Sequence, residues 1–589
     1  MDPAFQWDLS TLYMDDEAWE RDLPLLDQEI EEVAAFQGTL TDAKTIRAYL
    51  DAETGMERRL SDIYTYAMLR QAEDTTANEG QVLMSKATGR YVNAVSKTSF
   101  ARPEMLALPE EELKKITESE ELVPYRFTMQ QLLDEKPHVL SGKEEELLAG
   151  FSEVLGAPKR IAENLMDADL TFAPAKDQDD REHELNEANF ILLQQSPDRT
   201  LRENVFHNYY AGFRNHINTF AAAYSGVVKA AAAEAKARHY ESSRAMAMAG
   251  EHIPASVYDG LVDTVRRFLP AMYRYVALRK KILGLSDLHY YDVYVPLSQG
   301  SRGHWSYEEA QEMVLRAVAP LGTTYTSKVR DAFQSRWIDV YPNEGKRGGA
   351  FSSGTYDSNP YILTSFAGDY DSVSTIAHEM GHSMHTWFSQ QHQPPQYGDY
   401  TLFVAEVAST VNENLLVEDL LRQTTAPAER LFLLNQYLEG FKGTVFRQTM
   451  FAEFERDAHR MAEAGEALTP DALSGLYRKL IADYFGPELS IDDEVQYEWA
   501  RIPHFYRPFY VYKYATSYSA AVALSDGILE KGESVVQPYL SFLSMGGSAY
   551  PLDELRSAGI DLATTAPIEN ALEKFERILD DAEETVRTL

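Results

Sequence analysis

The sequence predicts a mainly α-helical protein with one small β-sheet. Long stretches place apolar residues three and four positions apart with charged residues between them, which is the spacing of an amphipathic helix. One segment, residues 346–370, is instead rich in Gly, Ser, Asn and Pro, which break helices. Within it, residues 361–366 (YILTSF) predict a short strand. The helical pattern is clear at residues 27–36, 110–116, 201–224 and 471–484.

The chain is long enough for several domains or for one large body with fused lobes. It has 589 residues, of which 44% are hydrophobic and 25% are charged, an ordinary balance for a globular protein. A boundary is predicted near residue 195, because Ser196 and Pro197 resemble the N-cap and first residue of a helix. We therefore expect a helical N-terminal portion at 1–195 and a portion carrying the chemistry at 196–589.

The charge of the chain argues against several classes of partner. There are 92 acidic and 55 basic residues, so the formal net charge is −37, whereas nucleic acid and anionic lipid both require Lys/Arg patches. The most apolar long stretch, residues 220–237, contains three charged residues and predicts a soluble helix. The first residues lack the basic and apolar regions of a secretory signal. We expect a cytoplasmic protein with no nucleic-acid or membrane partner.

The strongest motif is His-Glu-x-x-His at residues 378–382. Because the chain has no cysteine, any metal must be held by nitrogen and oxygen ligands. On a helix, His378 and His382 would lie about 40° apart around the axis and about 6 Å apart along it, so both rings can reach one ion. Glu379 would project beside that ion toward a bound water. Gly381 lowers helix propensity, and close approach of another segment would explain its presence.

A catalytic zinc site needs a third protein ligand and an open fourth position. The metzincin pattern requires a glycine and a third histidine at positions where this chain has His385 and Phe388, so that class is excluded. His385 would overshoot an ion held by the first two histidines, which favours a packing role. Glu406 is the better candidate, because its neighbours in a predicted helix are apolar and an unpaired carboxylate is costly there. Pairing with an arginine is the alternative, both for Glu406 and for Glu413, which could otherwise orient a ligand imidazole.

A dense aromatic cluster occupies residues 501–518, which contain His504 and five tyrosines. Neutral imidazole and phenol groups can stabilise an oxyanion that forms when a carbonyl is attacked. The alternative is an aromatic core stripe, since Tyr510, Tyr514 and Tyr518 would fall on one face of a helix. Periodicity alone does not decide between the two.

Taken together, these motifs resemble the thimet-oligopeptidase-like metallopeptidases, and within them the oligoendopeptidase F group. The resemblance spans at least residues 200–589, and the distance of 24 positions from His382 to Glu406 also fits the family. The matching pieces are KRGGAFSSG at 346–354, HEMGHSMH at 378–385, FVAEVASTVNE at 403–413, RIPHFYRPFYVYKYATS at 501–517 and FLSMGGSAYP at 542–551.

The resemblance implies a fold, a cofactor and a set of site residues. The implied fold is a large two-lobed helical metallopeptidase with a deep central channel and a small sheet beside the motif helix that pairs with extended substrate. The implied cofactor is one zinc ion per chain, held by His378, His382 and Glu406, with Glu379 as general base. His504, Tyr510 and Tyr514 are implied as catalytic or oxyanion contacts, and Gly354, Tyr361, Ile362, Leu363 and Tyr512 as substrate contacts.

The expected activity is zinc-dependent hydrolysis of internal bonds in short, unstructured oligopeptides. Two alternatives remain at this point. One is a carboxypeptidase-type zincin with the same ligand pattern, which product analysis on end-blocked peptides would distinguish. The other is a non-catalytic peptide-binding protein on the same scaffold. Retention of Glu379 argues against the second, because zinc binding alone needs no base at that position.

Overall fold

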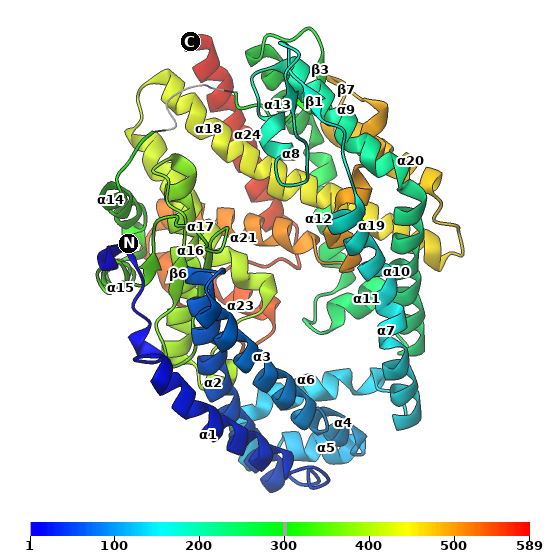
Figure 1. The fold of residues 1–589 in the computed structure, drawn as a ribbon, viewed down its shortest axis with the longest axis vertical. Helices are drawn as coiled ribbons and strands as arrows, with labels where there is room; N and C mark the ends of the chain where they lie inside the picture. Colours follow the sequence, from blue (N-terminus) through cyan, green and yellow to red (C-terminus); the bar gives the residue numbers. More distant parts are fainter. Residues whose placement is uncertain (1, 298–302) are drawn as a thin grey trace. The chain divides into compact units, whose positions relative to one another are not determined.

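The computed structural model describes residues 2–297 and 303–589, most of which lie in helices, as predicted (Figure 1). The chain forms two compact units, each built from three segments. Unit 1 comprises Met1–Val139, Arg302–Asp419 and Ala521–Ile560, and unit 2 comprises Leu140–Ser301, Leu420–Ala520 and Asp561–Leu589. In the part of the chain that is described, no helix is both long and apolar enough to span a bilayer.

The predicted boundary at residue 195 does not coincide with this division, because that residue lies inside unit 2. A helix does begin nearby, but the prediction of Ser196 as its N-cap and Pro197 as its first residue is two residues too early. Asp198 is the N-cap of α9 (Arg199–Asn215), and its carboxylate accepts hydrogen bonds from the backbone N–H groups of Thr200 and Leu201. A capping residue satisfies the free N–H groups of a first helical turn wherever a helix begins. It therefore carries no information about where a domain ends.

Unit 1 opens with three long helices packed on one another, α1 (Asp16–Ala34), α2 (Ala43–Glu73) and α3 (Asn78–Thr98). Their apolar faces form a core in which Trp19 and Ile63 have no exposed surface. The predicted helix at 27–36 coincides with the last turns of α1, which ends two residues earlier than predicted, and the one at 110–116 is confirmed as α5 (Glu110–Thr117). Further helices of unit 1 are α4 (Ala101–Ala107), α5 (Glu110–Thr117), α6 (Arg126–Glu135), α14 (Tyr307–Ala317), α15 (Thr323–Gln334), α16 (Tyr370–His392), α22 (Glu533–Leu543) and α23 (Pro551–Ser557), together with most of α17 (Leu402–Gln423).

A three-stranded sheet of order β4-β6-β5 packs against the helix that carries the His-Glu-x-x-His motif. Its strands are β4 (Ile338–Asp339), β5 (Phe351–Ser353) and β6 (Tyr361–Leu363). β6 pairs with β4 in parallel and with β5 antiparallel, so it is the central strand. The predicted strand at 361–366 is confirmed over its first three residues.

Unit 2 is a second helical body. The predicted helix at 201–224 is interrupted at His216, where α9 ends and α10 begins, whereas the helix at 471–484 is confirmed as α20. Two small sheets join β1 (Ala175–Lys176) to β2 (Glu182–His183) and β3 (Leu288–His289) to β7 (Leu489–Ser490). The helices are α7 (Gly142–Asn164), α8 (Phe190–Gln194), α10 (Ile217–Ala237), α11 (Ser243–Ala249), α12 (Ala255–Arg267), α13 (Leu269–Ile282), α18 (Pro427–Phe441), α19 (Arg447–Glu463), α20 (Pro470–Phe485) and α24 (Ala566–Thr588).

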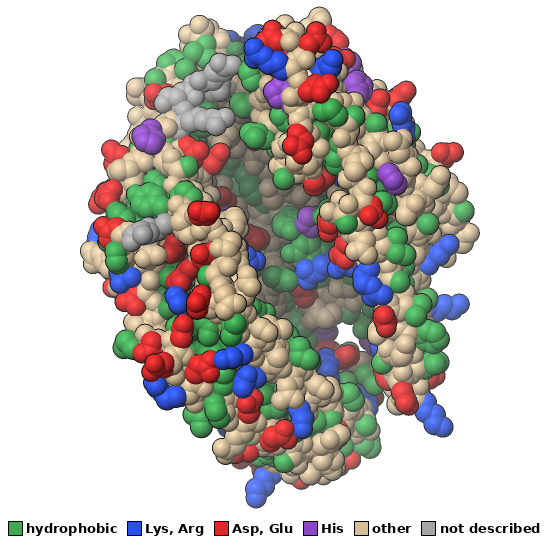
Figure 2. Space-filling model, viewed as in Figure 1, with side chains coloured by type: hydrophobic (Ala, Val, Ile, Leu, Met, Phe, Trp, Pro, Cys, Tyr) green, Lys and Arg blue, Asp and Glu red, His purple; other side chains and the backbone are tan. Residues whose placement is uncertain are grey.

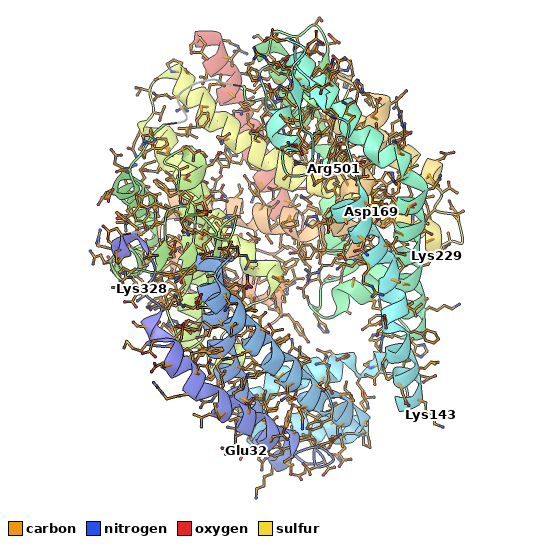
Figure 3. All side chains as sticks on the ribbon, in the orientation of Figure 1. Glu32, Lys143, Asp169, Lys229, Lys328 and Arg501 are labelled. Atoms are coloured by element: carbon orange, nitrogen blue, oxygen red, sulfur yellow. The ribbon has the colours of Figure 1, made fainter. Side chains whose placement is uncertain are left out.

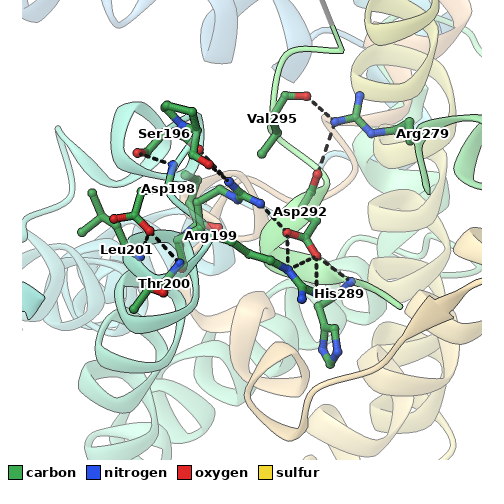
Figure 4. A network of polar contacts seen from close by, with 12 residues as sticks. Ser196, Asp198, Arg199, Thr200, Leu201, Arg279, His289, Asp292 and Val295 are labelled. Carbon is green, nitrogen blue, oxygen red and sulfur yellow. Dashed lines mark hydrogen bonds and ion pairs between the residues drawn. The ribbon is translucent and has the colours of Figure 1, made fainter. Parts of the chain in front are cut away.

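A buried carboxylate ties α9 to the turn that follows β3 (Figure 4). Asp292 has no exposed surface, and its oxygens lie 2.7 Å from Arg202 Nη2 and 3.0 Å from Arg199 Nη2. The backbone N–H of His289 donates a third hydrogen bond to it at 3.1 Å. A buried charge is tolerated when it is paired and hydrogen-bonded in this way.

At the surface, acidic side chains are scattered over the face shown in Figure 2, in keeping with the net charge of −37.

Candidate active site

The three predicted metal ligands converge in unit 1. His378 Nε2 and His382 Nε2 are 3.2 Å apart, and Glu406 Oε2 lies 3.5 Å from the first and 3.6 Å from the second. In a tetrahedral site with bonds of about 2.0–2.1 Å, neighbouring donor atoms are about 3.3–3.4 Å apart. The observed triangle fits that geometry, and two imidazoles with one carboxylate are a donor set that zinc accepts. Among the described residues, these three form the group able to hold a metal ion.

Two helices position these ligands. α16 (Tyr370–His392) carries both histidines on successive turns, and α17 (Leu402–Gln423) carries Glu406. Gly381 is the point of close approach between them. A Cβ atom on Gly381 would lie 2.5 Å from Ser409 Cα and 2.6 Å from the Ala408 carbonyl oxygen. The predicted close approach is confirmed, and it brings the turn of α17 that contains Glu406 beside the two histidines.

Glu406 differs from expectation in one respect. Its helix neighbours Val404 and Val407 are fully buried, but its own side chain is 40% exposed. The cost of burying an unpaired carboxylate therefore does not explain its position. A ligand in a catalytic site lies where incoming molecules can reach the metal, and the partial exposure of this side chain is compatible with that role.

Glu413 contacts the other ring nitrogen of His378. Its Oε2 atom lies 3.4 Å from His378 Nδ1, and its Oε1 atom accepts a hydrogen bond from Ser374 Oγ at 3.4 Å. A carboxylate at Nδ1 holds the imidazole in the tautomer whose Nε2 lone pair is free to bind a metal. The structure thus favours the orienting role for Glu413 over an arginine pair.

Glu379 lies on the same helix turn as His378 and is only 7% exposed. Burial raises the pKa of its carboxyl to about 7; His378 and a hydrogen bond from the Ser352 backbone oppose this shift, and the Glu406 carboxylate adds to it. A general base is most effective when its pKa lies near the working pH. The strand β5 is fixed to the same helix by a second contact, since Ser352 Oγ and Ser383 Oγ are 2.8 Å apart.

Sequence reasoning missed Ser352 and Ser383. Ser383 lies four residues after Glu379, one helical turn further along, and this spacing could have identified it. Ser352 lies inside the conspicuous FSSG segment, but no spacing rule connects that segment to α16.

His385 packs and does not join the ligand group, as predicted. It is 1% exposed, and its ring stacks on Tyr400 with centroids 3.6 Å apart and planes 5° apart. Burial lowers the pKa of His385 to about 3, so the ring is neutral at physiological pH.

The structure contradicts the prediction that Tyr361, Ile362 and Leu363 contact substrate. All three are fully buried, and both edges of β6 are occupied by neighbouring strands, so no backbone group is left to pair with a peptide. The outer side of β4 is also in use, because Val340 N–H donates to the Phe5 carbonyl. β4 and β5 are the two edge strands of this sheet, and β5 is the one that packs against the motif helix α16.

Two other predicted substrate contacts have structural roles. A Cβ atom on Gly354 would lie 2.8 Å from the Asn359 carbonyl oxygen, so this glycine permits the turn between β5 and β6. Tyr512 has no exposed surface, and its ring packs on Tyr258 with centroids 5.0 Å apart. Its burial contradicts a direct contact with substrate, whereas a backbone contact at Gly354 stays a prediction.

His504, Tyr510 and Tyr514 come together in unit 2, in the segment that begins at Arg501 (labelled in Figure 3). His504 Nε2 lies 3.4 Å from Tyr514 Oη, and the rings of Tyr510 and Tyr514 meet edge to face with centroids 5.4 Å apart. His504 is exposed and the two tyrosines are half-buried. Desolvation and the nearby Arg507 guanidinium lower the pKa of His504, so its ring is neutral at pH 7.

The structure does not contain the single helical tyrosine stripe that periodicity left open as an alternative. The helix α21 (Tyr512–Lys531) begins after Tyr510, so Tyr510 is not part of it. Tyr518 is on the helix but is 9% exposed and packs on Phe441. Tyr510 therefore reaches Tyr514 through a bend in the backbone and not through helical periodicity.

Comparison with known proteins identifies the family. The family model described as Peptidase family M3 matches residues 192–574, and the one described as Oligopeptidase F matches residues 104–172. The chain belongs to peptidase family M3. The resemblance to the oligoendopeptidase F group is confirmed, as is the mainly helical fold.

Close relatives extend over nearly the whole chain. Oligopeptidase PepF of Bacillus subtilis (strain 168) is 44% identical over 98% of this chain and 87% of its own length. Group B oligopeptidase PepB of Streptococcus agalactiae is 40% identical over 100% of this chain and 98% of its own length. The crystal structure of oligoendopeptidase-F from Enterococcus faecium is 34% identical, with a TM-score of 0.75 over 98% of this chain and 100% of that one.

Proposed function

We propose that this family M3 peptidase is a zinc-dependent endopeptidase that hydrolyses internal bonds of short, unstructured oligopeptides. The observation that carries the proposal is the triangle of donor atoms from His378, His382 and Glu406, with edges of 3.2, 3.5 and 3.6 Å, beside the buried carboxyl of Glu379. Similarity to proteins named oligopeptidase and oligoendopeptidase supports the class of substrate.

In this proposal His378, His382 and Glu406 hold one zinc ion per chain. When bound, the ion would supply Lewis-acid activation of water and of the scissile carbonyl. Glu379 takes a proton from the attacking water and delivers it to the leaving amine. Glu413 holds the His378 ring in the binding tautomer through Nδ1.

The edge of β5 offers extended substrate a backbone to pair with. Its register relative to α16 is fixed by the Ser352–Ser383 hydroxyl contact at 2.8 Å and by the hydrogen bond from Ser352 N–H to the Glu379 carboxyl. A peptide paired with β5 would therefore be placed by the same residue that contacts the base.

We extend the proposal to His504, Tyr514 and Tyr510 as groups that stabilise the oxyanion. Its support is the clustering of one neutral imidazole and two phenols in a motif that resembles the family pattern. Such donors contribute most when they are fixed before charge develops.

Digestion of a mixed peptide pool, followed by mass spectrometry, tests the proposal. Peptides blocked at both ends should be cut internally, and a chelator should abolish the cuts until zinc is restored. A carboxypeptidase-type enzyme would leave the blocked peptides intact and release fragments only from free C-termini. A non-catalytic binding protein would retain peptides without cutting any. Full activity in metal-free protein would contradict the zinc assignment.

A further inference from the structure

Phe509 adopts an unusual backbone conformation inside unit 2. Its φ angle is +57°, in the left-handed region that residues with a side chain rarely occupy. It is also 3% exposed, so the conformation does not belong to a loose surface loop. Strained residues of this kind persist only when the surrounding structure holds them, and they concentrate at functional sites.

A buried carboxyl group from a distant helix holds this residue. Phe509 N–H donates a 2.7 Å hydrogen bond to Glu455 Oε1, although the two residues are 54 positions apart. Glu455 lies on α19 and has no exposed surface, and among the described residues its other oxygen has no hydrogen-bond partner. Burying a carboxyl with one partner is costly, so the contact combines two unfavourable features.

The side chain of Phe509 is held as well. Its ring lies 4.5 Å from the His459 ring and 5.9 Å from the Tyr258 ring, measured between centroids. His459 is itself 1% exposed and is fixed by a 2.9 Å contact between its Nδ1 and Ser243 Oγ. Both the backbone and the ring of Phe509 are therefore anchored to the core of unit 2.

The chain leaves this anchor directly into the aromatic cluster. Tyr510 is the next residue, and its ring stacks nearly parallel to His504 and meets Tyr514 edge to face. Because the φ angle of Phe509 sets the direction in which the chain continues, it sets where the Tyr510 ring lies relative to the other two. A shift of about 1 Å in such groups is enough to cost 10²-fold in rate.

We infer that Glu455 is a positioning residue for turnover: through the Phe509 N–H it fixes the left-handed turn that assembles His504, Tyr510 and Tyr514. The inference rests on the proposed function, since the cluster's part in turnover belongs to that proposal. Burial raises the pKa of Glu455 well above its usual range, which favours the uncharged form of the acceptor. A glutamine side chain presents the same acceptor with the same shape.

The test compares three substitutions at this position. Glu455→Gln should keep kcat within about twofold of the natural enzyme, because it retains the acceptor. Glu455→Leu, which removes it, and Glu455→Asp, which withdraws it by one methylene, should lower kcat about tenfold or more with little change in KM, while zinc content stays at one per chain. The Asp variant keeps the test decisive if the Leu variant fails to fold.

Glu453→Leu is the matched control. Glu453 is also buried on α19, but it contacts Arg266 and Tyr484 and not the Phe509 turn. Its loss should lower the melting temperature with kcat of the folded enzyme unchanged. Equal kcat effects at positions 453 and 455, or normal kcat in Glu455→Asp, would overturn the inference.

Tyr514→Phe separates this inference from the proposed function. If Tyr514→Phe slows turnover and Glu455→Asp does not, the positioning role is wrong and the cluster's role stands. If Tyr514→Phe and Tyr510→Phe both leave turnover unchanged, the proposed role of the cluster in turnover is wrong, and the positioning role that rests on it is wrong as well. With both roles correct, Tyr514→Phe combined with Glu455→Leu should be little slower than the slower single variant, since the two act through one group.

Discussion

The metal cluster of unit 1 and the His504–Tyr514 segment of unit 2 are built in different ways. In the first, His378, His382 and Glu406 project from two regular helices, and the spacing along each helix determines where the side chains point. In the second, Tyr510 is placed by a left-handed residue that is held by a carboxyl 54 positions earlier. When side chains project from regular helices, their positions can be predicted from the residue spacing. When they lie on irregular backbone, their positions depend on distant buried groups that the local sequence does not reveal.

The largest effect is expected from Gly381→Ala. The added methyl group would meet Ser409 Cα at 2.5 Å, and neither backbone can yield without moving α17 away from α16. Glu406 would move with it, so the variant should lose most of its bound zinc and most of its activity.

Metal analysis and a thermal melt check the Gly381→Ala prediction. Gly55→Ala is the control, because a Cβ atom at Gly55 in α2 meets nothing within 4 Å. If Gly381→Ala keeps stoichiometric zinc and normal turnover, the close approach of the two helices is not what positions Glu406.

The two regions also differ in how far the sequence could predict them. The spacing of His378 and His382, the exclusion of His385 and the close approach at Gly381 follow from helix geometry, and the structure agrees with each. Glu406 lies on a second helix and was assigned from its apolar neighbours and the family resemblance, and its 40% exposure shows that the burial argument does not explain its position. Periodicity left a helical tyrosine stripe open as an alternative, and the structure excludes it because Tyr510 lies outside α21.

The other predictions that the structure contradicts failed because they depend on contacts between residues far apart in the sequence. The strand at Tyr361–Leu363 was recognised, but which strand forms an edge depends on the pairing order β4-β6-β5, which no local pattern encodes. The Ser196–Pro197 signal lies two residues before the true helix start, which Asp198 caps, and it does not mark a boundary between units. No sequence pattern indicated a positioning role for Glu455, because its hydrogen-bond partner is the backbone N–H of a residue 54 positions later.

The substitution Tyr514→Phe tests whether the His504–Tyr514 segment of unit 2 takes part in turnover. It deletes one hydroxyl, 3.4 Å from His504 Nε2, and leaves the ring in place. If that hydroxyl stabilises the oxyanion, kcat should fall by about 10²–10³-fold with little change in KM, because the interaction strengthens only as charge develops.

Steady-state kinetics with Tyr512→Phe as the control decide the point. Tyr512 is fully buried, so its hydroxyl should affect stability and not turnover. Equal, near-normal rates in both variants would show that the cluster is packing.

Glu413→Ala should have a smaller effect, on metal affinity. Its carboxylate lies 3.4 Å from His378 Nδ1 and is not a ligand itself. Loss of such an outer partner lowers metal affinity by about 10–100-fold while the three ligands remain. Competition with a chelator of known affinity measures this change, and unchanged zinc affinity would contradict the orienting role.

A further prediction concerns the pH dependence of stability and a second buried carboxyl. Glu554 in unit 1 is 1% exposed and accepts a hydrogen bond from the Ala549 backbone, as Glu455 does from Phe509. Burial raises the pKa of Glu554 to about 8 from an ordinary value of 4.5. The folded protein therefore keeps a proton that the unfolded chain releases, and the free energy of unfolding should fall as pH rises from 4.5 to 8.

Glu554→Gln removes this contribution because an amide does not ionise. The stability of the variant relative to the natural protein should rise by at most about 1.4 kcal/mol per pH unit across that window and then level off. Chemical denaturation at several pH values measures the difference. Parallel pH profiles for the two proteins would mean that Glu554 is ionised in the folded state.

The most direct test measures zinc content and kcat on the same preparations of the natural protein, Glu379→Gln and Glu406→Ala. Glu379→Gln should hold one zinc per chain and bind peptide normally, with kcat lower by roughly 10²–10⁴-fold or more, because only the base is lost. Glu406→Ala should lose both zinc and activity, because two histidines alone hold the ion weakly. Stoichiometric zinc with normal turnover in Glu406→Ala, or normal turnover in Glu379→Gln, would contradict the account.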